Sequence, residues 1–254
     1  GLALFERRKT GYIATPAGEE MAGLAGRMEE DVTTFSRRLA GREIEPTGEV
    51  RVTTSDTLFL DLLLPIFAEF RQRSPAIRLD VVLANHALNL SRRDADVAIR
   101  ATDAPPESLV GRRLATLAWA LYAGIDEAKK QPERFAPERR YGLTWVTLGD
   151  AMAHVKAARH VREHVLPENI ALKTSAVLGM AEASAAGIGI GLLPCFIGDQ
   201  RDDLVRLEAP NPDFATGLWL LTHPDIKQTP RVRVLMDFCG AEITKKKKLI
   251  EGGT

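Results

Sequence analysis

Residues 49–83 read EVRVTTSDTLFLDLLLPIFAEFRQRSPAIRLDVVL, and this stretch decides the fold class. Residues 49–53 alternate between polar and apolar side chains, which predicts a strand. Residues 58–73 are rich in apolar side chains and predict a helix, and residues 77–83 predict a second strand. Because strands that alternate with helices build parallel sheets, the sequence predicts an α/β domain with a mostly parallel sheet.

The same alternation continues along the chain. A short polar helix is expected near residues 88–93, a strand over 95–100 and a longer apolar stretch over 113–123. A second unit follows, with strands over 141–147, 170–174, 188–193 and 204–207, and helices over 150–164 and 175–186. The strand over 218–222 and the helix from Pro230 to about Ile243 have no parallel partner in that unit, so we expect them to return to the first. The prediction is two α/β lobes joined by two crossover strands, with a ligand cleft between them.

The N-terminal part predicts a long helix. Thr15 can cap free backbone N–H groups, and Pro16 suits the first helical position. A seam of apolar residues with heptad spacing follows: Met21, Ala25, Met28, Val32, Phe35 and Leu39. A helix from Pro16 to about Ala40 is roughly 37 Å long, and so narrow a stripe favours pairing with a second helix. The alternative is a helix that packs on its own domain.

Bulk properties limit the possible classes of protein. The chain has 254 residues, 45% of them hydrophobic, and its 34 Lys and Arg balance 34 Asp and Glu. A chain without net charge gives no compositional sign of nucleic-acid binding. No apolar run has the length of a membrane span, and the first residues lack the order of a secretory signal, so we expect a cytoplasmic protein that does not contact a membrane. Cys195 and Cys239 fit no metal or redox spacing and are expected to be buried, reduced thiols.

Two motifs suggest chemistry that the surrounding sequence does not support. The glycines at 187, 189 and 191 follow a helix and enter a strand, whereas a dinucleotide fingerprint follows a strand and opens a helix. His160-Val161-Arg162-Glu163-His164 matches the H-x-x-E-H pattern of one zinc protease class. Neighbouring arginines and an apolar row on the same helix favour a solvated helix face instead. We therefore expect no enzyme activity, no metal and no cofactor.

The candidate binding residues lie at the ends of predicted strands. Ser55, Asp56 and Thr57 join the first strand to its helix, and Thr174 and Ser175 occupy the matching turn of the second unit. Hydroxyls and free N–H groups at helix N-termini suit a carboxylate or an inorganic oxyanion, although each turn alone is also an ordinary helix cap. Asp56 additionally suits the ammonium group of an amino acid.

Further candidates are Arg100, Thr102 and Thr147. Arg100 ends a predicted strand on the cleft side and offers a planar fork for a carboxylate, while an exposed surface arginine is the alternative.

The chain resembles the LysR-type transcription regulators. Residues 1–18, GLALFERRKTGYIATPAG, are similar to the end of their winged helix-turn-helix domain. The resemblance continues to about residue 243 through short pieces: Leu63-Leu64-Pro65, Phe70, Pro75, Asp96-Val97-Ala98-Ile99-Arg100, Leu109-Val110-Gly111-Arg112-Arg113-Leu114, Gly187-Ile188-Gly189 and Leu193-Pro194. Each piece is weak alone, but their order and spacing are specific.

The resemblance implies a domain plan. The wing of the DNA-binding domain spans residues 1–14, with most of its helix-turn-helix expected to precede Gly1, and a dimerising linker helix spans 15–41. A hinge covers 41–48. Lobe I takes 48–124 and 218–243, lobe II takes 125–217, and a solvated tail takes 244–254. The two lobes are expected to resemble type 2 periplasmic binding proteins.

The resemblance also implies partners. The effector is expected between the lobes, against the turns at Ser55–Thr57 and Thr174-Ser175. The full-length protein is expected to bind promoter DNA as a homodimer or homotetramer, and Arg7, Arg8 and Lys9 of the wing can contact phosphates. The alternatives are a solute-binding protein of a transport system and, on His160 and His164, a metal-dependent hydrolase.

Overall fold

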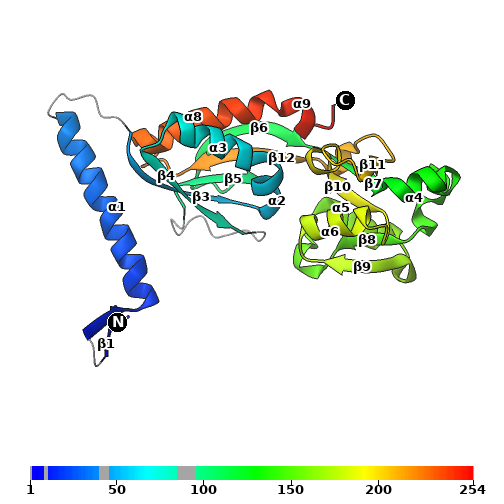
Figure 1. The fold of residues 1–254 in the computed structure, drawn as a ribbon, viewed down its shortest axis with the longest axis horizontal. Coiled ribbons are helices and arrows are strands. Elements are labelled where there is room, and N and C mark those ends of the chain that lie inside the picture. Colours follow the sequence, from blue (N-terminus) through cyan, green and yellow to red (C-terminus); the bar gives the residue numbers. More distant parts are fainter. Residues whose placement is uncertain (1, 9–10, 40–45, 85–94, 254) are drawn as a thin grey trace.

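The computed structural model describes residues 2–8, 11–39, 46–84 and 95–253. The chain forms an N-terminal hairpin and long helix at one end, followed by two lobes (Figure 1). The expected hinge at 41–48 falls largely outside the described residues, and the expected helix at 88–93 falls wholly outside them. No helix in the described part of the chain is both long and apolar enough to cross a bilayer.

The first segment is a hairpin followed by a long helix. Strand β1 (Phe5–Arg8) pairs antiparallel with β2 (Gly11–Ala14), and the exposed Arg7 lies on β1. Lys9 and the side chain of Arg8 lie outside the described part. Helix α1 (Pro16–Leu39) begins where the sequence predicts, because Thr15 Oγ1 accepts the Gly18 N–H at 3.1 Å. Gly18 is required there, since a Cβ would lie 2.0 Å from the Leu4 carbonyl oxygen.

The apolar seam of α1 is exposed where its side chains are described. Met21 is 54% exposed, Met28 62% and Val32 65%, and Ala25 is exposed as well. Phe35 and Leu39 belong to the helix, but their side chains lie outside the described part.

Lobe I contains a five-stranded sheet in the order β4-β3-β5-β12-β6. Its strands are β3 (Gly48–Thr54), β4 (Ile77–Leu83), β5 (Val97–Ala101), β6 (Val110–Leu117) and β12 (Thr216–Thr222). Strand β3 runs parallel to β4 and β5, while β12 runs antiparallel to β5 and β6. The sheet is therefore mixed, and β12 returns from the far part of the chain as predicted.

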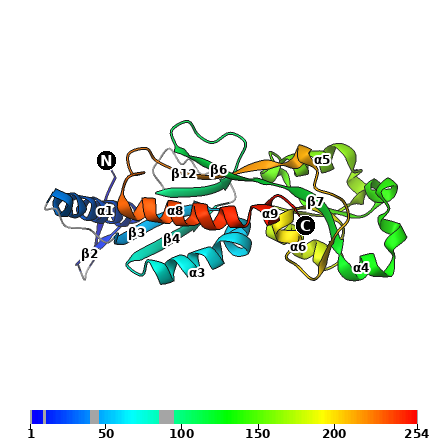
Figure 2. The same ribbon diagram turned by 90° about the horizontal axis from the view of Figure 1, so that it is seen from above.

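Helices cover this sheet. The predicted helix over 58–73 consists of α2 (Asp56–Leu58), a π-helical turn η1 (Phe59–Leu63) and α3 (Leu64–Arg73). Pro65 explains the interruption, because it has no N–H to donate to the Asp61 carbonyl four residues earlier. Helix α8 (Pro230–Lys245) packs beside α3, where Phe70 meets Phe238 at a ring distance of 5.4 Å. Figure 2 shows α8 running along the sheet.

Lobe II is built on two smaller sheets. In the first, β7 (Trp119–Gly124) lies between β10 (Gly191–Pro194) and β11 (Leu204–Arg206), and both neighbours are antiparallel to it. In the second, β8 (Trp145–Leu148) runs parallel to β9 (Ile170–Thr174). The helices are α4 (Ile125–Lys130), α5 (Lys156–His164), α6 (Val177–Ala185) and α7 (Cys195–Gly198).

Several strands and helices of lobe II are shorter than predicted. The strand expected from residue 141 begins only at Trp145, because η4 (Pro137–Gly142) is a 3-10 helix. The helix expected from residue 150 is a short turn, η5 (Asp150–Met152), followed by α5. The strand expected from residue 188 begins at Gly191, and Ile190 adds only an isolated bridge to Trp145. Short 3-10 turns also precede β9 and β12, at η6 (Pro167–Asn169) and η7 (Pro212–Phe214), and η3 (Pro132–Phe135) follows α4.

The chain crosses between the lobes twice. Strand β6 ends at Leu117 and β7 begins at Trp119, so the first crossing lies at Ala118. This corrects the expected boundary at residues 124–125, because β7 pairs only with strands of lobe II. The second crossing leads from β11 to β12, which begins at Thr216.

The last residues are not a solvated tail. Helix α8 extends to Lys245, and a further helix, α9 (Lys247–Ile250), packs against α7, α8 and β6. The side chain of Ile250 is 0% exposed and belongs to the core. The prediction of a solvated tail was wrong because the four lysines dominate the composition, whereas Leu249 and Ile250 decide the packing. Cys195 and Cys239 are buried and free, as expected.

Candidate small-molecule site between the lobes

A cavity of about 130 Å³ lies where the two lobes and the first crossing meet. Its size is close to that of an engineered cavity that takes up benzene, about 150 Å³. Lobe I contributes Ser55, Asp56, Thr57, Leu58, Arg100 and Ala101; the first crossing contributes Leu117 and Trp119; lobe II contributes Met152, His154, Val155, Val177, Pro194 and Phe196.

One end of the cavity is the turn between β3 and α2. Ser55 has extended backbone angles, φ −84° and ψ 159°, and its side chain accepts the Leu58 N–H at 3.3 Å. The Oγ atom of Ser55 and the Oγ1 atom of Thr57 lie 3.3 Å apart, and Asp56 Oδ1 accepts the Thr57 N–H at 2.7 Å. Ser55 is therefore a helix cap, and it also borders the cavity.

Arg100 supplies positive charge to the same end. Its guanidinium donates to Thr53 Oγ1 at 2.8 Å and to the carbonyl oxygen of Ala84, and both acceptors are neutral. In the described part of the chain no carboxylate forms a salt bridge with it. Burial lowers the pKa of Arg100, because removal from water penalises the charged form. A partly buried cation with neutral partners favours an anionic ligand.

The rest of the wall is mostly apolar. Leu117, Trp119 and Phe196 are at least nine-tenths buried, and Met152, Val155 and Val177 face them from lobe II. The exposed His154 adds a polar group on that side. The cavity thus has a polar, cationic end and an apolar body. Such a lining is complementary to a small organic anion, whose charged group and apolar part it can contact separately.

Four predicted binding residues do not line this cavity. Thr102 accepts the Ala104 N–H at 3.1 Å in the loop after β5. Thr174 accepts the Ala176 N–H at 3.3 Å, so its hydroxyl is used locally, and Ser175 is exposed. Thr147 is buried and lines a separate hollow of lobe II beside Arg162 and Lys173. Of the two turns predicted to face each other, the turn at Ser55–Thr57 lines the cavity and the turn at Thr174-Ser175 does not.

Sequence reasoning missed the apolar wall. Leu117 and Trp119 lie in the apolar stretch 113–123, and knowledge of the crossing there would have placed them at the cleft. Pro194 ends β10 and Phe196 lies two residues later, and the pairing of Pro194 with Trp119 brings them to the same place. Nothing in the local sequence marks Met152, His154 or Val155.

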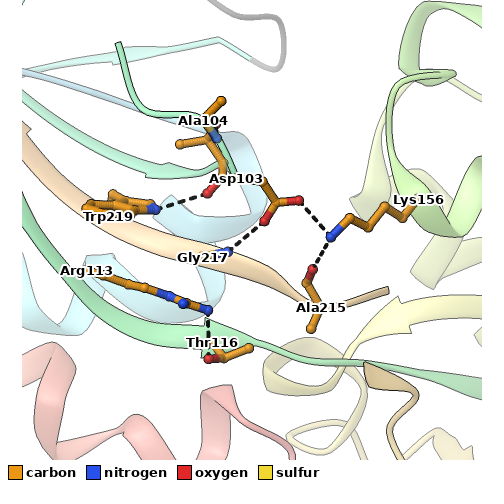
Figure 3. Close-up of polar contacts among 9 residues, drawn as sticks. Asp103, Ala104, Arg113, Thr116, Lys156, Ala215, Gly217 and Trp219 are labelled. Carbon is orange, nitrogen blue, oxygen red and sulfur yellow. Dashed lines mark hydrogen bonds and ion pairs between the residues drawn. The ribbon is translucent and has the colours of Figure 1, made fainter. Parts of the chain in front are cut away.

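Polar contacts between side chains and backbone also join the two lobes directly. Lys156 of α5 pairs with Asp103 of lobe I at 2.7 Å and donates to the Ala215 carbonyl at 2.7 Å, as Figure 3 shows. Asp103 also accepts the Gly217 N–H at 3.4 Å. After α7, Gln200 donates to the Asp61 carbonyl at 3.3 Å, which adds a second contact between the lobes.

The histidine motif has a structural explanation. The rings of His160 and His164 stack with their centroids 4.2 Å apart, and His160 Nε2 lies 3.1 Å from the Tyr141 hydroxyl. No group of three or more potential metal ligands occurs in the described part of the chain. The pair is thus part of an aromatic cluster with Tyr141 and Phe214.

A larger hollow, about 280 Å³, lies on the outside of lobe I between β6, β12 and α8. Its charged lining residues are all exposed, so water already solvates them: Arg112, Lys227, Arg233 and Asp237. It lies away from the junction of the lobes, and we therefore place the candidate site in the smaller cavity.

Residues 44–244 match the family model described as the LysR substrate binding domain. The chain belongs to this LysR family. Its fold agrees with that of CrgA, a LysR-type transcriptional regulator from Neisseria meningitidis: the TM-score is 0.68 at 22% identity, over 95% of this chain and 84% of that one. The AmpR effector binding domain from Citrobacter freundii gives a TM-score of 0.65 at 14% identity and covers 78% of this chain and 100% of that one. The predicted two-lobed fold is confirmed.

Curated relatives in the LysR family are regulators. An HTH-type transcriptional regulator from Xanthomonas campestris pv. campestris (strain 8004) is 28% identical over 142 residues, which is 54% of this chain and 40% of that protein. The regulator CrgA of Neisseria meningitidis serogroup C (strain 8013) is 32% identical over 115 residues, 45% of this chain and 38% of that protein. The chain thus spans about two fifths of the length of these relatives.

Proposed function

We propose that this chain is the effector-sensing part of a ligand-responsive transcription regulator, and that its interlobe cavity binds a small organic anion. The observation that carries the proposal is Arg100, whose partly buried guanidinium has neutral hydrogen-bond partners, among the described residues, at the polar end of an apolar cavity. A carboxylate with an apolar body can contact both Arg100 and the apolar wall, whereas an inorganic oxyanion can contact Arg100 but has no apolar part to pack against that wall. Ser55, Asp56 and Thr57 are proposed to orient the polar group.

The family favours a regulator over a transport protein. The relatives and solved structures described above are transcriptional regulators or their effector domains. We further propose that promoter DNA and a second copy of the chain are partners of the full-length protein, and that α1 supplies the contact between copies.

A thermal-shift comparison tests the ligand proposal. Benzoate, small aliphatic acids, amino acids, sulfate and phosphate are added at millimolar concentration to the wild type and to Arg100→Gln. A ligand at 100 times its Kd stabilises by about 2.7 kcal/mol, which raises the Tm by roughly 5–10 °C in a domain of this size. We expect the organic acids to give the larger shift and Arg100→Gln to abolish it.

The control is Arg112→Gln, which removes an exposed arginine from the outer hollow of lobe I and should leave the shift intact. An acid that stabilises Arg100→Gln as strongly as the wild type would show that the anion binds elsewhere. A sulfate shift equal to the benzoate shift would contradict the role of the apolar wall.

A further inference from the structure

The segment 247–253 is anchored at the first crossing between the lobes. The Ala118 N–H donates to the Ile250 carbonyl at 3.1 Å, and the Thr116 N–H donates to Glu251 Oε1 at 3.0 Å. Arg206 Nη1 donates to the Gly252 carbonyl at 3.0 Å. Thr116 belongs to β6 of lobe I and Arg206 to β11 of lobe II, so this short segment is bonded to both sides of the crossing.

Segment 247–253 is closely packed against the rest of the chain. Ile250 is fully buried. Gly252 has φ +69°, which favours glycine, and a Cβ there would lie 2.7 Å from Pro210 Cγ and 2.9 Å from Cys195 Sγ. Figure 2 shows α9 at the junction of the two lobes.

The segment and the interlobe cavity lie against the same two pieces of chain. Leu117 and Trp119 line the cavity, and Ala118 between them bonds to Ile250. Pro194 and Phe196 also line the cavity; Cys195 between them lies beside Gly252 and donates its N–H to the Ala118 carbonyl at 2.8 Å. Residues 117–119 run from β6 into β7, and alternate residues of an extended chain face opposite sides; at 194–196 the chain passes from β10 into α7, and the contacts above place Cys195 on the side of Gly252. The two pieces therefore form a shared wall, with the cavity in front and segment 247–253 behind.

We propose that segment 247–253 is a clamp that fixes the bend of the crossing at Ala118 and thereby sets the relative position of the lobes at the cavity. A rotation of the lobes changes the backbone angles at Ala118, so it must break the Ala118–Ile250 bond or carry the segment with it. Release of the clamp and movement of the lobes are then coupled, and by linkage each shifts the equilibrium of the other. This inference does not depend on the identity of the ligand.

Spin labels test the clamp without any ligand. Labels are placed at the exposed positions of Gln72→Cys on α3 and Glu163→Cys on α5, because the native Cys195 and Cys239 are buried. The interlobe distance is then measured by pulsed electron paramagnetic resonance in the wild type, in Ile250→Ala, in Glu251→Ala and in a chain that stops after Lys246. The matched control is Lys248→Ala, which removes an exposed side chain of α9.

We expect one narrow distance peak for the wild type and the control, and a broadened or displaced peak for the three variants. Hydrogen exchange of the same proteins separates release of the clamp from general loss of stability. Amides of residues 116–119 and 195–196 should exchange about tenfold faster in Ile250→Ala, while those of Val50 and Val52 keep their protection.

Unchanged peaks in Ile250→Ala and Glu251→Ala would overturn the proposal, because both variants remove defined contacts of the clamp. Exchange that rises equally at Val50 would also overturn it, since that result shows a purely structural role for α9. If the shortened chain does not fold, the two point variants decide the question.

Discussion

At the residue scale, His160 links a sequence motif to the pH dependence of stability. Burial, followed by the nearby His164 and Arg140, lowers the pKa of His160 below its ordinary value of 6.5. The unfolded chain then binds a proton more readily than the folded one. This group's contribution to stability is present above pH 6.5 and is lost as the pH falls through the window below that value.

We therefore expect the free energy of unfolding to decrease between pH 7 and pH 5, and His160→Gln to flatten that decrease. Urea unfolding at several pH values measures it. Tyr141→Phe keeps the histidine and should keep the slope. An identical slope in the wild type and His160→Gln would show that other groups cause the pH dependence.

Ser55 separates helix capping from ligand binding. Because its side chain accepts the Leu58 N–H, Ser55→Ala should lower the free energy of unfolding by about 1 kcal/mol, and Ser55→Asn, which preserves an acceptor, by much less. Chemical denaturation checks the two values. Equal losses in both variants would mean that the cap does not contribute.

At the element scale, most strands and helices follow from local patterns. Strands 77–83 and 170–174 lie within the predicted bounds because polar turns limit both. Residues 141–144 were predicted as part of a strand over 141–147, yet Pro137 starts a 3-10 turn that reaches Gly142, and the buried Leu143 packs without strand pairing. Apolar composition indicates burial but cannot distinguish a strand from a buried turn.

The candidate site was only partly predictable for a related reason. Ser55 and Arg100 follow from their positions at strand ends, whereas Trp119 and Phe196 reach the cavity through pairing between segments about 75 residues apart, which one sequence does not display. Thr174 shows the reverse error, because a hydroxyl before a helix can bond to its own backbone instead of a ligand.

The exposed seam of α1 predicts self-association. Leu24 and Met28 face a hollow that also includes Ile226 and Val232 of lobe I, but Met21 lies outside it and is 54% exposed. Burial of a methionine side chain contributes about 1.5–3 kcal/mol, so Met21→Glu should weaken association by roughly 10- to 100-fold. Sedimentation velocity measures the change, with Glu20→Gln as the control on the polar face. Unaltered association would favour the alternative in which α1 packs on its own lobe.

At the scale of the whole molecule, charge limits what this chain can do with DNA. The chain has 34 positively and 34 negatively charged side chains. The described part of the wing consists of β1 and β2, and its candidate for a contact with DNA is the exposed Arg7. Contacts of this kind are made to phosphates, and they position a protein without reading bases. The 254-residue chain should therefore bind duplexes weakly, with a Kd of about 10⁻⁴–10⁻⁶ M, whatever their sequence.

Fluorescence anisotropy with two unrelated duplexes at 50 and 200 mM salt measures this affinity. Because each phosphate contact contributes about −0.9 to the slope of log K against log salt, Arg7→Ala should make the slope shallower by at most about one unit on both duplexes. The exposed Arg233→Ala on lobe I should leave it unchanged. Strong preference for one duplex would contradict this account, since base readout requires an element inserted into a groove, and a two-stranded hairpin with phosphate contacts alone does not supply it.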